Sequence, residues 1–257
     1  MSSSNNLFFS ETSLSKYYAN HRFCWNKFYP SERKVIQWIK PDDQTKILDI
    51  GCACGGLGFA LLKRFGSSMY SGVEMNKKCI EIAKNKVPWG RFLQGDFLAL
   101  NKKKFLLRPY HLVVSLSGID WNIEFSKMLK KSWELVQPGG YLLLSVRLTT
   151  GASTEEISKS YQFVRFDGKK IGQKAPYRVL NGSYFGTLLR GLKPQRLLAY
   201  GFWGKPSPSA ATPFFRVCFC VFGIQKTSPK TTNLRKKNII RLPANINTLL
   251  AKGFHKS

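Results

Sequence analysis

Acidic residues and histidine are scarce in this sequence, and long apolar runs are absent. The chain of 257 residues has 14 Asp and Glu against 41 Lys and Arg, and three His. No stretch of eighteen consecutive apolar residues occurs, which excludes a membrane-spanning helix. The Ser- and Asn-rich start, residues 1–15, lacks the basic and apolar segments of a secretory signal, so we expect a cytoplasmic protein.

Asp and Glu are missing altogether from the last third of the chain. Residues 168–257 contain seventeen Lys and Arg, and the formal net charge of the whole chain is +27. Such a charge attracts polyanions, including RNA, DNA and anionic lipids, as well as small anions. A basic surface without a specific polyanionic partner is the alternative, because net charge governs association and not fold.

The six cysteines form no Cys-x-x-Cys pair. Without a secretory signal, reduced thiols are expected rather than a disulfide framework. Only one residue separates Cys52 from Cys54, and only one separates Cys218 from Cys220, whereas the cysteines of a zinc knuckle usually stand two or more residues apart. No metal site is therefore expected.

Short apolar runs alternate with segments of helical periodicity over the central part of the chain. With 43% hydrophobic residues, the protein can bury a large core. The expected strands are 46–51, 69–75, 91–94, 111–116 and 141–146, and the expected helices are 57–65, 77–87 and 124–136. This alternation predicts an α/β fold, a doubly wound and mostly parallel sheet with helices on both faces.

The alternation ends near residue 147. Asn181 is predicted to cap a helix over 184–192. Two strand-like runs, 195–202 and 214–223, then follow with only a Pro-, Ser- and Gly-rich loop between them. They should pair as an antiparallel C-terminal hairpin at the edge of the sheet, which would then have seven strands.

A strand, a turn of small residues and a helix follow one another over residues 47–65. Small residues let the backbone approach a ligand, and the helix N-terminus offers free N–H donors, so this turn is predicted to bind a nucleotide cofactor. Gly51-x-Ala53-x-x-Gly56 nearly fits the dinucleotide fingerprint, in which Glu74 would bind the ribose. An NAD-binding oxidoreductase is therefore one hypothesis.

A second pattern fits the same turn more closely. Asp49-x-Gly51-x-Ala53-x-Gly55 resembles the Asp/Glu-x-Gly-x-Gly-x-Gly motif of class I S-adenosylmethionine-dependent methyltransferases, with Ala53 in place of the middle Gly. Alanine is tolerated there if its φ is negative. Further motifs similar to those of the family follow in order: Glu74 after the second strand, Gly95-Asp96-Phe97 after the third, and Val136–Tyr141 before the fifth.

The resemblance covers about residues 45–225 and implies S-adenosylmethionine as the cofactor. It implies a methyltransferase domain over 41–225, in which an insert at 148–192 shapes the acceptor site. The aromatic-rich segment 1–40, with a helix over 33–39, is expected to form a lid. Residues 226–257 are expected to form a basic, flexible tail with a short helix near 246–251. The cofactor-binding residues that it implies are Asp49, Gly51, Ala53, Gly55, Glu74, Met75, Asp96, Phe97 and Ser115.

The chemistry of the acceptor is less defined. A sulfonium cofactor brings its own activated methyl, so the protein must align the acceptor, and it needs a base only where the acceptor loses a proton. Residues 115–121 contain neither the Asn/Asp-Pro-Pro-Tyr/Phe motif of amine methylation nor a cysteine nucleophile. Asp120 and His21 are the predicted catalytic residues, with Tyr17 and Tyr18 as further candidate bases.

A small-molecule O or N acceptor is the leading functional hypothesis, with Tyr161, Tyr177 and Arg178 as expected lining residues. The alternative is an RNA-associated methyltransferase or binding protein that uses the basic C-terminal third. A protein that binds the cofactor without catalysing transfer is a third hypothesis. The sequence makes no prediction of the oligomeric state.

Overall fold

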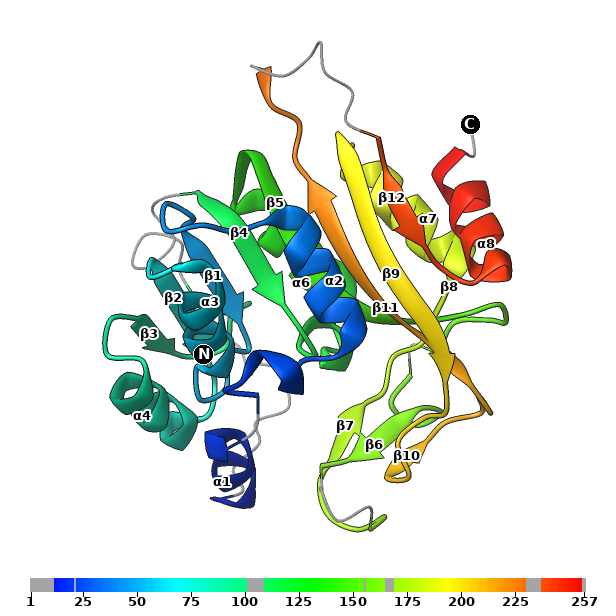
Figure 1. Cartoon of the computed structure of the whole chain (residues 1–257). Coiled ribbons are helices and arrows are strands. Elements are labelled where there is room, and N and C mark those ends of the chain that lie inside the picture. Colours follow the sequence, from blue (N-terminus) through cyan, green and yellow to red (C-terminus); the bar gives the residue numbers. More distant parts are fainter. Residues whose placement is uncertain are drawn as a thin grey trace.

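A large mixed sheet forms the centre of the molecule (Figure 1). The computed structural model describes residues 12–20, 22–100, 109–154, 156–164, 169–229 and 237–255. Within them the sheet has nine strands: β1 Ile47–Ile50, β2 Tyr70–Glu74, β3 Arg91–Gln94, β4 Tyr110–Ser115, β5 Val136–Thr149, β8 Leu180–Asn181, β9 Arg196–Gly204, β11 Val217–Gln225 and β12 Ile239–Arg241.

The strand order is β12-β9-β11-β5-β4-β1-β2-β3, and β8 pairs with the end of β5. Strands β3, β2, β1, β4 and β5 are mutually parallel. Strand β11 runs antiparallel between β5 and β9. The carboxyl ends of the five parallel strands therefore meet at one edge of the sheet, where α/β proteins bind their ligands.

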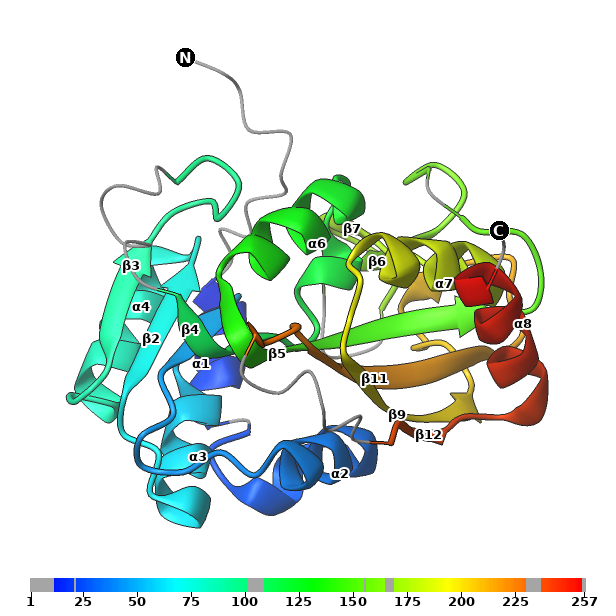
Figure 2. The ribbon, with the colours of Figure 1, turned by 90° about the horizontal axis from the view of Figure 1, so that it is seen from above.

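Helices cover both faces of this sheet (Figure 2). One core cluster joins α6, α7 and α8 to the sheet, and a second joins α2, α3 and α4 to its other face. The described α-helices are α1 Thr12–Asn20, α2 Pro30–Ile39, α3 Gly56–Phe65, α4 Lys77–Lys86, α6 Phe125–Glu134, α7 Gly182–Gly191 and α8 Ala244–His255, and the short 3₁₀ helices are η1 Trp25–Lys27 and η2 Ile119–Trp121. None of them is long and apolar enough to cross a membrane.

The predicted fold class is confirmed, with two differences in detail. The sheet has nine strands rather than seven, because β8 and β12 join it. The predicted hairpin forms from β9 and β11, but it is not the edge, since β12 pairs with the outer side of β9. Asn181 caps α7 as predicted, and its side chain accepts hydrogen bonds from the backbone N–H groups of Ser183 and Tyr184.

Residues 237–255 fold onto the domain, so the prediction of a flexible tail is wrong for them. Ile246 and Leu250 of α8 are buried in the same core as α7. Glycines let the two helix backbones touch: a Cβ added to Gly186 would lie 2.3 Å from the Leu250 carbonyl oxygen, and one added to Gly253 1.8 Å from that of Ser183. This burial fixes the segment in place, and it could not be predicted from the basic charge of the segment.

A second, three-stranded sheet lies below the large one in Figure 1. Its strands are β6 Tyr161–Phe163, β7 Lys174–Pro176 and β10 Ala210–Ala211, in the order β10-β6-β7. Strands β6 and β7 come from the predicted insert, whereas β10 comes from the loop that joins β9 to β11. The insert and the hairpin loop thus build one structure beside the edge where ligands are expected.

Replacing Gly186 with alanine is expected to weaken the docking of α8. The added methyl would overlap the backbone of α8, and overpacking of this kind typically costs about 1–3 kcal/mol. The measurement is the free energy of unfolding in urea. Gly191→Ala is the control, because no atom lies within 4 Å of a Cβ at that position. Equal stability of the two variants would contradict this packing.

Candidate functional site

A cavity of about 1000 Å³ opens at the carboxyl edge of the parallel strands. The residues that line it fall into two groups, according to the strands that they follow. The loops after β1, β2 and β3 form one part, which we call the cofactor half, and its residues include Asp49, Glu74 and Asp96. The loop after β4, the end of β5 and the small sheet with its hairpin form the other part, the acceptor half.

The turn between β1 and α3 has alternating left-handed residues. The φ angles of Gly51, Ala53 and Gly55 are +77°, +46° and +80°. The condition of a negative φ at Ala53 is therefore not met, and an alanine in this conformation costs about 1–2 kcal/mol. A hydrogen bond offsets part of this cost, because the Ala53 N–H donates to Glu74 Oε2 at 3.0 Å.

Glu74 lies at the end of β2 and holds this turn from the side. Its Oε2 accepts from Ala53, and its Oε1 accepts from the backbone N–H of Asn76 at 2.9 Å. A carboxylate has about four acceptor positions, so acceptor capacity remains for donors from a ligand. Burial raises the pKa of Glu74, and hydrogen bonds from the backbone N–H groups of Asn76, Ala53 and Met75 oppose that shift.

Asp49 is buried at the end of β1. Its Oδ2 accepts a hydrogen bond of 2.5 Å from the hydroxyl of Tyr70. Burial raises the pKa of Asp49 to about 7, against the lowering effects of that hydrogen bond and of the Arg22 guanidinium. This carboxyl is therefore poised to become fully charged when a cation binds beside it.

Asp96 and Phe97 begin the loop after β3, and both line the cavity. Asp96 Oδ1 accepts from the Leu98 N–H at 3.0 Å. Lys131 of α6 holds the loop from behind: its ammonium donates to the carbonyls of Phe97, Leu98 and Leu100 and lies 4.9 Å from the centre of the Phe97 ring. The loop shape thus depends on a residue outside the cavity.

Most of the predicted cofactor residues lie around the cavity, but two do not. Asp49, Gly51, Ala53, Glu74, Met75, Asp96 and Phe97 line it. Gly55 faces Val87 and Phe92 instead. Ser115 is fully buried, and its Oγ accepts from the Ile119 N–H at 3.0 Å, so it stabilises the turn after β4. His21 lies outside the described residues.

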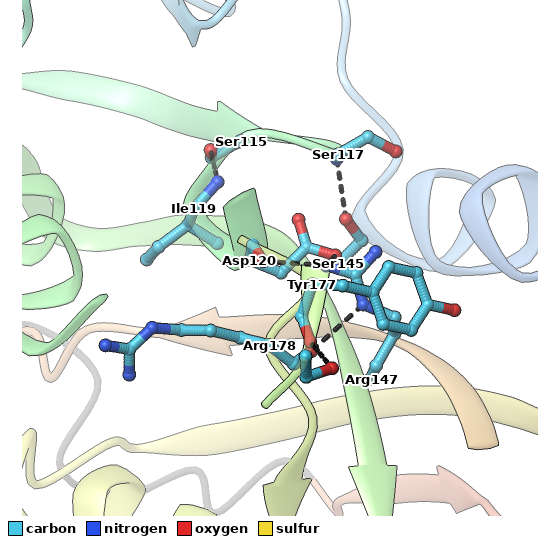
Figure 3. A network of polar contacts seen from close by, with 9 residues as sticks. Ser115, Ser117, Ile119, Asp120, Ser145, Arg147, Tyr177 and Arg178 are labelled. Atoms are coloured by element: carbon cyan, nitrogen blue, oxygen red, sulfur yellow. Dashed lines mark hydrogen bonds and ion pairs between the residues drawn. The ribbon is translucent and has the colours of Figure 1, made fainter. Parts of the chain in front are cut away.

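A buried ion pair forms the floor of the acceptor half (Figure 3). Arg147 Nη2 lies 3.2 Å from Asp120 Oδ2 and also donates to the Asp120 carbonyl at 2.7 Å. Arg147 Nε donates to the Arg178 carbonyl at 3.0 Å. The guanidinium stacks over the rings of Tyr177, at 3.9 Å, and Trp121, at 5.0 Å.

These contacts change the role expected for Asp120. Burial raises its pKa, and the Arg147 charge opposes that shift. Its Oδ2 is committed to Arg147, while Oδ1 is buried and makes no hydrogen bond to the described residues. The geometry therefore fits a residue that orients Arg147 better than a base in direct contact with an acceptor.

The sequence predicted only some of the other residues that line the cavity. Tyr17, Tyr18 and Tyr177 line the cavity, but Tyr161 and Arg178 do not. The sequence analysis missed Arg147, although it is the single charged residue in the apolar run of β5 and could have been noticed there. It also missed the residues of the N-terminal segment and of the hairpin loop that line the cavity, among them Arg22, Glu32, Lys205, Ser207 and Ser209.

The comparisons with known proteins agree with this geometry. Residues 47–140 match a family model described as a methyltransferase domain. The chain is 30% identical over 135 residues to malonyl-[acyl-carrier protein] O-methyltransferase of Halalkalibacterium halodurans, covering 51% of this chain and 48% of that protein. It is 27% identical over 182 residues to trans-aconitate 2-methyltransferase of Deinococcus radiodurans, covering 67% and 66%.

The fold is shared with a solved structure, the N-terminal domain of EvdMO1 with bound S-adenosylhomocysteine. The TM-score is 0.55 at 15% identity, over 77% of this chain and 82% of that one. Residues 47–140 thus match a methyltransferase domain, and the chain resembles class I S-adenosylmethionine-dependent methyltransferases in sequence and fold. This match decides against the NAD-binding hypothesis. The chain spans only between about half and two thirds of the curated relatives named above.

The residues of the cofactor half fit the cofactor of this family. S-adenosylmethionine carries a sulfonium and an ammonium, and the cofactor half offers three carboxyl groups, from Asp49, Glu74 and Asp96. The acceptor capacity left on Glu74 suits the ribose hydroxyls. Phe97 and Met75 supply apolar surface for the adenine ring.

Substituting Glu74 with glutamine is expected to weaken the binding of S-adenosylhomocysteine at least tenfold. The variant loses charge-assisted hydrogen bonds, which contribute about 1.5–3 kcal/mol each. Titration calorimetry measures the dissociation constant, with Glu81→Gln, an exposed carboxylate of α4, as the matched control. A Glu74 variant that binds as tightly as the parent would remove this residue from the site.

Binding of the same ligand is expected to tighten as the pH rises from 6 to 8. Asp49, with a pKa of about 7, is largely protonated at the lower pH, and its ionised form attracts the ligand's ammonium. The affinity should therefore fall by up to about tenfold per pH unit below 7 and level off above it. In Asp49→Asn this dependence should disappear. An unchanged pH profile in that variant would assign the titration to another group.

Proposed function

We propose that this protein is an S-adenosylmethionine-dependent methyltransferase that methylates a carboxylate oxygen of a small-molecule acceptor. The observation that carries the proposal is the continuity of one cavity from the acidic cofactor half to the acceptor half. A donor in the first half and an acceptor in the second can meet within it, away from bulk water. Alignment of this kind is the main requirement of methyl transfer.

The charges of the two halves support an anionic acceptor. Asp49, Glu74 and Asp96 bring carboxyl groups to the cofactor half. In the acceptor half the charges of Arg147 and Asp120 balance each other, so Lys205 supplies the positive charge that remains there. An acceptor carboxylate would therefore be drawn toward the basic half and held facing the cofactor half.

A carboxylate acceptor also agrees with the state of Asp120. A carboxylate has no proton to lose, so its methylation requires no general base. Asp120 is tied to Arg147, and the described lining of the acceptor half contains no histidine. The names of the two relatives described above refer to acceptors that are carboxylic acids, malonyl-[acyl-carrier protein] and trans-aconitate. This similarity favours methylation of a carboxylate.

The residues of this chain have separate tasks in the proposed reaction. When bound, S-adenosylmethionine supplies an activated methyl group. Glu74, Asp49 and the loop held by Lys131 orient the nucleoside and amino-acid parts. Tyr177 and Trp121, braced by Arg147, give the acceptor an apolar wall. The carboxylate oxygen forms the new bond to carbon as the carbon–sulfur bond breaks, and the products are a methyl ester and S-adenosylhomocysteine.

The proposal is tested by incubating the protein with labelled S-adenosylmethionine and matched acids, phenols and amines. Methyl esters, recognised by their release of methanol in alkali, are expected only from the acids. In Lys205→Gln, KM for an acid should rise several-fold with kcat little changed, because Lys205 acts through charge attraction. Lys252→Gln, at an exposed position of α8, is the control. Transfer to phenols or amines that is lost in Asp120→Asn would instead make Asp120 a base and overturn the carboxylate proposal.

A further inference from the structure

Exposed apolar side chains occur in the insert and in the β9–β11 hairpin, the elements that contribute to the acceptor half. Phe215, which follows β10 in the hairpin loop, is 80% exposed, the largest value among the bulky apolar residues described. Phe202 of β9 is 38% exposed, and Ile171 in the turn between β6 and β7 is 57% exposed. Burying such side chains releases free energy, so their exposure is unfavourable in water alone.

Cations accompany these apolar residues. The ammonium of Lys205 lies 5.7 Å from the centre of the Phe215 ring, and the guanidinium of Arg216 lies 4.8 Å from that of Trp203. Two lysines, at 169 and 170, precede Ile171 in the chain. We call Lys205, Phe215 and Arg216, which lie at the end of the β9–β11 hairpin, the rim surface.

No acidic side chain from the last third of the sequence can balance this charge, because residues 168–257 contain no Asp or Glu. The rim surface therefore places the projecting ring of Phe215 beside the cations of Lys205 and Arg216. That combination matches the interface of an anionic bilayer, where apolar side chains enter the acyl region and Lys or Arg contacts the headgroup phosphates.

The hairpin that carries Phe215 is held in a fixed shape. Strands β9 and β11 pair along nine residues, and β10 pairs with β6. Ser207 and Ser209 bond to each other, and the Ala210 N–H donates to the Ser207 carbonyl at 2.8 Å. Because the tip is already ordered, docking would cost little conformational entropy.

We propose that the rim surface docks the protein on an anionic lipid surface, with Phe215 inserted and Arg216 and Lys205 against the phosphates. A protein partner would need a pocket shaped for the projecting Phe215, whereas a bilayer accepts it without one. Phe202 and Lys205 also line the cavity. Docking would thus turn the mouth of the acceptor half toward the membrane. The proposal needs no methyl transfer and is tested without cofactor.

The test is co-sedimentation of the full-length protein with vesicles of phosphatidylcholine alone or mixed with phosphatidylserine. Binding is expected only to the mixed vesicles, and it should weaken as salt is added. Arg216→Glu should lower the partition coefficient about 25-fold, since one charge near such a surface contributes about fivefold and a reversal counts twice. Phe215→Ser should lower it at least about tenfold, because the burial of one Phe side chain is lost.

Matched controls separate docking from general attraction to a basic protein. Met69→Ser removes an exposed apolar residue just before β2, at the opposite end of the parallel strands from the cavity, and Lys252→Glu reverses a charge on α8. Both should bind vesicles like the parent. Because Phe215 and Arg216 lie outside the cavity lining, their variants should keep the parent's affinity for S-adenosylhomocysteine, which also reports correct folding.

Three results would overturn the proposal. The first is failure of the parent protein to bind mixed vesicles. The second is an equal loss of binding in Lys252→Glu and Arg216→Glu, which would show attraction without a docking face. The third is binding to an acidic polypeptide such as polyglutamate that depends on Phe215, with no binding to vesicles, which would assign the rim surface to an acidic protein partner.

Discussion

The buried guanidinium of Arg147 holds together three segments that are distant in the sequence. It comes from β5, contacts Asp120 of η2, and bonds to the backbone of Arg178 after β7. Breaking a buried ion pair by removing one partner leaves an uncompensated charge, which commonly costs about 3–5 kcal/mol. The acceptor half exists as a defined space because this one side chain joins the sheet, the loop after β4 and the insert.

The cofactor half follows largely from local sequence. A buried strand, a turn of small residues and a helix are neighbours in the chain, so their pattern predicted Asp49, Gly51 and Glu74 at the cavity. The positive φ of Ala53 could not be predicted from local sequence, because this strained conformation is supported by a hydrogen bond to Glu74, twenty-one residues away. Ser115 lies at the end of β4, close to the cavity edge as expected, but its hydroxyl accepts a hydrogen bond from the backbone N–H of Ile119 and does not face the cavity.

The acceptor half could not be predicted in the same way, since its parts meet only in three dimensions. Strand β10 pairs with β6 across about fifty residues, and Lys205 reaches the cavity from a loop that reads as a simple hairpin connection. The folding of residues 237–255 onto the domain could not be predicted for the same reason. The few apolar residues of this segment, among them Ile246 and Leu250, gain their partners from α7, which precedes them by more than fifty residues.

Lys131 shows how the loop after β3 keeps its shape at the edge of the cavity. Carbonyl oxygens of Phe97, Leu98 and Leu100 converge on its ammonium. A cage of backbone carbonyls is also how proteins strip and hold a potassium ion. Here the cation is tethered to α6, so it cannot be exchanged or diluted. The geometry of this loop is therefore indifferent to the sodium and potassium content of its surroundings, which a site built around a free ion would not be.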